Sequence, residues 1–198
     1  MFNINSIFGR CVLALAFLTG SATAVAGPTY HVNVDSARQK TQDGYLILSF
    51  LNTSTAAPAT ARVSNWSGSF LGTGMSYGDD ADVSVDFATR MLTLVAGTNG
   101  YLFDVNFGGL FGFDVTFDTE NVAAETNFGV ALSDAEGNYA GGGDVANIVL
   151  GTSGPAQLSV NADYASITPA ASAVPEPAEL ALVLTGLGLM GLMRRRRS

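Results

Sequence analysis

The stretch Phe111-Gly112-Phe113-Asp114-Val115-Thr116-Phe117-Asp118 alternates apolar or small side chains with polar ones almost without exception. Successive side chains of a β-strand point to opposite faces, whereas a helix would scatter these phenylalanines around a cylinder. The stretch therefore predicts a strand with one face in a core. The residues expected in the core are Phe111, Phe113 and Phe117, and those expected to face solvent are Asp114, Thr116 and Asp118.

The same period of two recurs on both sides of this stretch, in Asp82–Phe87, Tyr101–Phe107 and Phe128–Leu132. Further short strands are expected at Tyr30–Val34, Tyr45–Asn52, Thr60–Phe70, Met91–Val95, Val145–Leu150, Gln157–Val160 and Tyr164–Thr168. The glycine-rich segment Leu71–Gly78 is expected to be a loop. About ten short strands separated by turn signals, with no helical segment among them, predict an all-β fold. We expect a single antiparallel β-sandwich, of jelly-roll or immunoglobulin-like type.

The predicted sandwich domain covers residues 27–168, and an Ala/Ser/Pro-rich linker follows at residues 169–174. A chain of this length can bury a single core of good size. Residues 27–174 carry fifteen acidic and four basic side chains, a net charge of −11. Nucleic acid and anionic membrane surfaces repel such a body, so nucleic acid is not an expected partner. Cations and neutral glycans stay open as partners.

Residues 1–26 have the organisation of a signal peptide. Arg10 supplies the positive charge, Cys11–Thr19 the apolar core, and Ala24-Val25-Ala26 the small-residue cleavage site. Cleavage by signal peptidase after Ala26 would export the protein and remove its only cysteine. The exported domain would then hold together without disulfides.

Residues 175–198 form a tail of three parts. Pro175-Glu176-Pro177 comes first, an uncharged run from Leu180 to Met193 follows, and the cluster Arg194-Arg195-Arg196-Arg197 stands just before the C-terminus. As a helix at ~1.5 Å per residue the run would cover about 21 Å of a roughly 30 Å hydrocarbon layer, so it is short for a transmembrane helix. The four arginines favour the membrane assignment, because they would stop the helix and hold the C-terminus in the cytoplasm.

This tail resembles the PEP-CTERM sorting domain in the order of its three parts: Pro-Glu-Pro, short apolar helix, arginine cluster. The resemblance implies recognition by an exosortase, a membrane-embedded cysteine transpeptidase-like enzyme of Gram-negative bacteria that make exopolysaccharide. The protein would pass through an intermediate anchored in the inner membrane, lose its tail, and reach the outer surface or the extracellular matrix. A plain tail anchor that is never cut is the alternative.

The body is similar to small PEP-CTERM proteins in four segments that occur in the same order. These segments are Tyr30–Val34, Gly44–Leu46, Phe113–Phe117 and Asp134–Asn138. This second resemblance implies a sandwich of undetermined activity, not a known enzyme.

One segment matches a catalytic pattern by its letters. Gly74-Met75-Ser76-Tyr77-Gly78 has the G-x-S-x-G spacing of a nucleophile elbow. An elbow needs a helix after it and a histidine downstream, but the only histidine, His31, lies upstream. We therefore expect no nucleophile here, and no catalytic residue elsewhere.

A conventional zinc site is not expected, because the exported chain would have one histidine and no cysteine. We expect no cofactor. Calcium is the alternative, because it binds hard oxygen ligands in loops. The candidate ligands lie in two loops: Asp79, Asp80 and Asp82 in the first, and Asp134, Glu136 and Asn138 in the second.

Two further hypotheses concern carbohydrates. A glycoside hydrolase would need a carboxylate pair, and the three glutamates of the body, Glu120, Glu125 and Glu136, fall in or near predicted turns, which disfavours it. Sugar binding would instead use aromatic side chains on a sheet face. The candidates are Trp66, Tyr77, Tyr101 and Tyr139.

The sequence thus predicts a non-enzymatic, exported and exosortase-processed protein. Its expected role is structural or adhesive, in the exopolysaccharide matrix of a Gram-negative bacterium. A carbohydrate-binding module, calcium-assisted or not, is the alternative.

Overall fold

The computed structural model describes residues 27–39, 42–52, 59–118 and 122–170. These residues contain twelve strands and one short 3₁₀ helix, η1 (Asp80–Asp82). Among them no helix has the length and apolar character needed to span a membrane.

The predictions for the two ends of the chain lie outside the described residues. These ends are the signal peptide (1–26), the linker beyond residue 170 and the sorting tail (175–198). The individual residues concerned are Ala24 and Ala26 of the cleavage site, Pro175, Glu176 and Pro177 of the sorting motif, and the arginines Arg194, Arg195, Arg196 and Arg197. Their assignments therefore stay predictions from the sequence.

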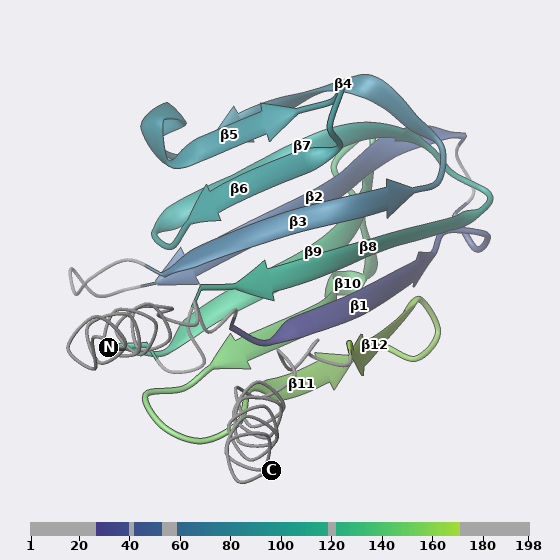
Figure 1. Cartoon of the computed structure of the whole chain (residues 1–198). Helices are drawn as coiled ribbons and strands as arrows, with labels where there is room; N and C mark the ends of the chain where they lie inside the picture. The colour runs from purple at the N-terminus through teal and green to yellow at the C-terminus, as the bar shows by residue number, and fades with distance from the viewer. Residues whose placement is uncertain (1–26, 40–41, 53–58, 119–121, 171–198) are drawn as a thin grey trace, which may run out of the picture. The chain divides into compact units, whose positions relative to one another are not determined.

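The strands form two six-stranded sheets, and every pairing between neighbouring strands is antiparallel (Figure 1). Sheet A has the order β12 (Ala165–Pro169), β1 (Thr29–Asp35), β8 (Leu110–Phe117), β3 (Thr60–Ser67), β6 (Met91–Val95), β5 (Val83–Asp86). Sheet B has the order β11 (Gln157–Val160), β10 (Tyr139–Leu150), β9 (Thr126–Asp134), β2 (Asp43–Asn52), β7 (Thr98–Asn106), β4 (Phe70–Tyr77). The all-β prediction is confirmed.

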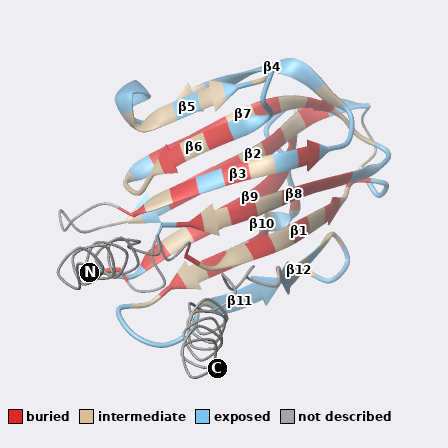
Figure 2. Cartoon of the chain, in the orientation of Figure 1, coloured by how far each residue is buried: buried red, intermediate tan, exposed pale blue. Residues whose placement is uncertain are grey.

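The two sheets face each other across one hydrophobic core. The alternating strand that predicted the fold is β8, in the middle of sheet A. Its phenylalanines Phe111, Phe113 and Phe117 are at most 1% exposed, whereas Asp114 and Thr116 point away from the core. Figure 2 shows the same alternation of buried and partly exposed positions along the neighbouring strands. The alternation of apolar and polar residues in the sequence therefore matches the alternation of buried and exposed positions in the strand.

Aromatic rings fill the space between the sheets. Phe117 of sheet A lies 5.7 Å from Phe50 and 5.9 Å from Phe128 of sheet B, measured between ring centroids. A second group centres on Phe103, whose ring centroid is 4.6 Å from that of Trp66. These edge-to-face and tilted contacts add to the free energy gained by burial, by about 0.5–1.5 kcal/mol per pair. With no disulfide in the described chain, this core carries the stability.

Six of the first eight strands pair in a nested order: β1 with β8, β2 with β7, and β3 with β6. Strands β4 and β5 do not pair with each other, because β4 pairs with β7 and β5 with β6. Strands β9–β11 then extend sheet B beyond β2, and β12 extends sheet A beyond β1.

The predictions for two segments were wrong. The expected loop Leu71–Gly78 is largely strand β4, which lies at the edge of sheet B and pairs only with β7. Glycine suits this position, because the carbonyl of Leu102 and the ring of Tyr101 leave no room for a side chain at Gly74. The expected strand Thr60–Phe70 is divided at Gly68, where φ is +124°, into β3 and the start of β4. The count therefore rises from about ten strands to twelve.

Candidate functional site

The outer face of sheet B carries a cross-strand row that joins residues far apart in the sequence. Tyr77 of β4 is opposite Gly100 of β7, Gly100 is opposite Ser49 of β2, and Ser49 is opposite Gly129 of β9. Gly129 is in turn opposite Asn147 of β10. We call this row, together with Asp144 and Tyr139 of β10, the tyrosine face.

The ring of Tyr77 lies over Gly100. A Cβ atom at residue 100 would overlap Cζ, the hydroxyl oxygen and Cε1 of that ring, so only glycine leaves the ring its place. One side of the ring is thus against the backbone of β7. The ring reaches across β7 toward β2, where the Tyr77 hydroxyl is hydrogen-bonded to Ser49.

Ser49 and Asp144 meet above Gly129. A Cβ atom at residue 129 would lie 2.6 Å from Ser49 Oγ and 2.7 Å from Asp144 Oδ2. Asp144 reaches this position because the register between β10 and β9 shifts on both sides of it. Such an irregularity redirects a side chain. Two glycines therefore form the floor of the site, and a phenol, a hydroxyl and a carboxylate gather on that floor.

The site changes the acidity of two of its groups. Partial burial is the main cause that raises the pKa of the Tyr77 phenol, and the charge of Asp144 raises it further. Partial burial also raises the pKa of the Asp144 carboxyl, against the opposing effect of a hydrogen bond from Asn147. At neutral pH the phenol is a hydrogen-bond donor, as its raised pKa requires.

Asn147 adds an unused acceptor. Its side chain is hydrogen-bonded to Asp144, but its carbonyl oxygen Oδ1 is buried and has no protein partner. Asn127, on the same side of β9, has a buried Oδ1 in the same condition. Buried polar atoms are normally hydrogen-bonded, so these two oxygens can accept bonds from buried water.

Tyr139 lies at the outer margin of the face. It begins β10, directly after the turn that Asp134 closes, and is 51% exposed. It is near enough to Tyr77 to contribute electrostatically to the raised pKa of that phenol. A second row, next to the polar one, is apolar: Met75, Leu102, Ile47 and Ala131.

The tyrosine face thus combines two phenols, a hydroxyl, a carboxylate and an amide with an apolar row. Sugar rings carry hydroxyl groups around an apolar ring face. Aromatic rings beside a few polar groups suit such a ligand. The predicted sugar-binding residues Tyr77 and Tyr139 lie on the same outer face of sheet B, and their sugar-binding role stays a prediction.

The other two predicted sugar-binding residues lie elsewhere. Trp66 is 4% exposed and Tyr101 is 5% exposed, and both face the core. Each packs against Phe103, with ring centroids 4.6 and 4.7 Å from it. Neither can stack on a ligand on a sheet face, because the period of two turns them inward.

The calcium candidates are engaged in local hydrogen bonds. Asp79 caps η1 through the amide of Ala81, Asp80 accepts from Ser76, and Asp82 accepts from Asn99. Asp134 accepts from the amides of Glu136 and Asn138 and from the Asn138 side chain, which closes the turn between β9 and β10. In the described part of the chain, no three histidine, cysteine or acidic side chains form a group able to hold a metal.

The residues weighed for catalysis are dispersed. Ser76 lies in β4 and donates a hydrogen bond to Asp80, while His31 lies in β1 and contacts Asp114. Glu125 and Glu136 are both exposed, and Glu120 is outside the described residues. Sequence reasoning assigned no role to Ser49, Asp144 or Asn147. A polar Ser49 within the apolar segment Tyr45–Leu51 was the one available signal.

No family profile, curated protein or solved structure matches this chain.

Proposed function

We propose that the chain is an adhesive matrix protein that binds neutral polysaccharide through the tyrosine face. The observation that carries this proposal is the gathering of Tyr77, Ser49, Asp144 and Asn147 over Gly100 and Gly129. These groups come from three strands, β4, β2 and β10, and two glycines leave room for them.

The charge of the body favours a neutral partner. Fifteen acidic side chains against four basic ones in residues 27–174 repel anionic polymers, and Asp144 adds a carboxylate at the site itself. A neutral glycan offers hydroxyl donors to Asp144 and to the phenol oxygen of Tyr139. Binding then needs neither a metal nor a covalent step.

Delivery to such a polymer is the second part of the proposal. The order of the tail, Pro175-Glu176-Pro177, Leu180–Met193 and Arg194–Arg197, supports sorting by an exosortase after export. Signal peptidase would cut after Ala26, and the inner membrane would hold the protein only until the tail is removed. The mature protein would then lie in the exopolysaccharide matrix at the cell surface.

Affinity electrophoresis in gels that contain neutral glucans, mannans or galactans tests the binding. We expect at least one neutral polymer to retard the protein, and we expect Tyr139→Ala and Asp144→Ala each to reduce the retardation about tenfold or more. Leu110→Ala is the matched control, since Leu110 is 65% exposed and lies in sheet A. Equal retardation of all four proteins, or none with any polymer, would contradict the proposal.

A further inference from the structure

A separate cavity lies away from the tyrosine face, where β3 ends and β5 turns into β6. Its volume is about 180 Å³, and its lining residues are Trp66, Gly68, Phe70, Gly72, Phe87 and Arg90. Three of the six are aromatic and two are glycines. None of the residues of the tyrosine face lines it.

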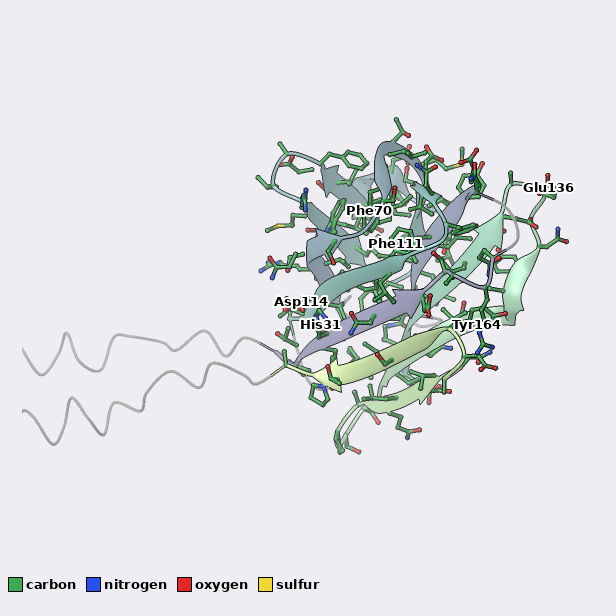
Figure 3. All side chains as sticks on the ribbon, turned by 90° about the vertical axis from the view of Figure 1, so that its right-hand side faces the viewer. His31, Phe70, Phe111, Asp114, Glu136 and Tyr164 are labelled. Atoms are coloured by element: carbon green, nitrogen blue, oxygen red, sulfur yellow. The ribbon has the colours of Figure 1, made fainter. Side chains whose placement is uncertain are left out.

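The aromatic side chains form a slot. Trp66 is almost fully buried, and its ring centroid lies 5.7 Å from that of Phe70 and 5.8 Å from that of Phe87. Phe70 and Phe87 are both half-buried; Phe70 begins β4 of sheet B, and Phe87 directly follows β5 of sheet A. Figure 3 shows Phe70 near Phe111, between the sheets, and their ring centroids are 5.3 Å apart. The slot is therefore continuous with the core but reaches the surface.

The glycines leave the entrance open. Gly72 has a φ of +77°, and no atom lies within 4 Å of where its Cβ would be. Gly68 has a φ of +124°, and its Cβ would meet the ring of Phe111. A positive φ favours glycine at both positions. Gly68, in the turn between β3 and β4, and Gly72, in β4, thus line the slot without placing a side chain in it.

Arg90 supplies the only charge in the lining. One guanidinium nitrogen, Nη1, donates a hydrogen bond of 2.9 Å to the carbonyl of Trp66. Arg90 has a φ of +53°, an unusual conformation for a residue with a side chain. The other N–H groups of the guanidinium can bind a planar, two-oxygen acceptor.

Arg90 also lacks a carboxylate partner among the described residues. Arg38 forms an ion pair with Asp163, but no acidic side chain of the described chain lies within 4.0 Å of Arg90. Asp86, in the same turn, instead binds the amides of Ala88 and Thr89 and the Thr89 hydroxyl. In a body this acidic, an arginine left unpaired beside an aromatic slot points to an anionic ligand.

We propose that this cavity binds one six-membered ring that carries a carboxylate. The ring would lie in the slot formed by Trp66, Phe70 and Phe87, and the carboxylate would pair with Arg90. The size supports a single ring, since a cavity of about 150 Å³ in another protein holds one benzene molecule. Two sources share this chemistry: a uronic acid at the end of a glycan, and a small aromatic acid.

The single tryptophan of the chain lines the cavity, so its fluorescence reports occupancy directly. The full chain, in a mild non-ionic detergent, is titrated with methyl glucuronide, which has a free carboxylate, and with benzoate. Methyl glucoside and benzyl alcohol are their neutral counterparts, and acetate supplies a carboxylate without a ring. We expect a saturable change in tryptophan fluorescence with at least one ring carboxylate. Its neutral counterpart and acetate should bind at least tenfold more weakly. Saturation by methyl glucuronide alone identifies the sugar source, and saturation by benzoate alone identifies the aromatic one.

Arg90→Gln should weaken binding of the ring carboxylate about tenfold or more, because a charge-assisted pair is lost. Arg62→Gln is the matched control, since Arg62 is exposed on β3 and also lacks a carboxylate within 4.0 Å in the described chain. If Arg90→Gln does not fold, the affinities of the unaltered protein for charged and neutral ligands still show whether the cavity recognises a carboxylate. No saturable change with either acid, or equal affinity for acid and neutral counterpart, would overturn the proposal.

Discussion

Nδ1 of His31 lies 2.7 Å from Oδ1 of Asp114, although the two residues are 83 positions apart in the chain. They are directly opposite each other in the pairing of β1 with β8, on the outer face of sheet A. Figure 3 labels both on the same side of the molecule. The other oxygen of Asp114 accepts a hydrogen bond of 2.8 Å from Asn65 of β3. One carboxylate therefore ties three neighbouring strands together.

Asp114→Asn should destabilise the protein more at neutral pH than in acid. The hydrogen bond from Asn65, followed by the bond and charge of His31, lowers the pKa of Asp114 below its ordinary value of 3.8. A lowered pKa adds stability above 3.8, and this stability is lost as the pH falls through the pKa of the folded state. Urea unfolding should show a free energy of unfolding lower by about 1 kcal/mol at pH 7.

The same comparison at pH 2 to 3 should show a smaller difference between the two proteins. In an Asn65→Gly background the substitution should also cost less at pH 7, because one of the partners is already absent. A difference that stays constant with pH would show that Asp114 stabilises the sheet without its charge.

At position 65, glycine should be better tolerated than alanine. Asn65 has a φ of +56°, in the left-handed region that asparagine and glycine tolerate and alanine does not. Both substitutions remove the bond to Asp114, but only alanine adds backbone strain. Asn65→Ala should therefore be less stable than Asn65→Gly by about 1 kcal/mol, measured by urea unfolding.

Ser64, the neighbouring residue, provides the control because its φ is not positive. There the order should reverse, with glycine below alanine, since glycine in a strand interior loses more chain entropy. The same order at both positions would mean that the conformation of residue 65 is not the cause.

Calcium should leave the melting temperature of the body unchanged. The oxygens of Asp134 are occupied by the donors of Glu136 and Asn138, and the acids near η1 bind Ser76, Ala81 and Asn99. A scan with millimolar calcium should shift the transition by less than about 1 °C, with magnesium as the control for ionic strength. A saturable rise that a chelator reverses would restore calcium as a cofactor.

Replacement of Arg194, Arg195, Arg196 and Arg197 by glutamine should stop delivery to the outer surface. Without guanidinium groups behind Leu180–Met193, the positive-inside bias that orients the tail is lost. Intact-mass measurement of surface and membrane fractions should find the processed body for the unaltered chain and not for the variant without the four arginines. Arg62→Gln, with one charge removed from the body, should be delivered normally. Equal delivery of all three proteins would remove the sorting hypothesis.

Much of the fold followed from local patterns. The alternation in Phe111–Asp118 predicted strand β8 with its inward face correct, and the largely apolar segment Tyr45–Asn52 predicted strand β2. Strand propensity did not predict β4 (Phe70–Tyr77), because glycine-rich segments rarely form strands on their own. Here the segment is a strand because it pairs with β7. The pairing of β1 with β8, or of β2 with β7, has no local signature, since any two alternating strands can pair.

For the site, the sequence alone determined which residue types were available: tyrosines, glycines and carboxylates in an acidic body with one tryptophan. Only the tertiary structure decided that Tyr77 and Tyr139 share a face with Asp144, whereas Trp66 and Tyr101 do not. The reason is geometric. The alternation of side chains fixes which residues of one strand lie on the same face. Packing of the whole core sets the strand order and the register, and these decide which residues of different strands become neighbours.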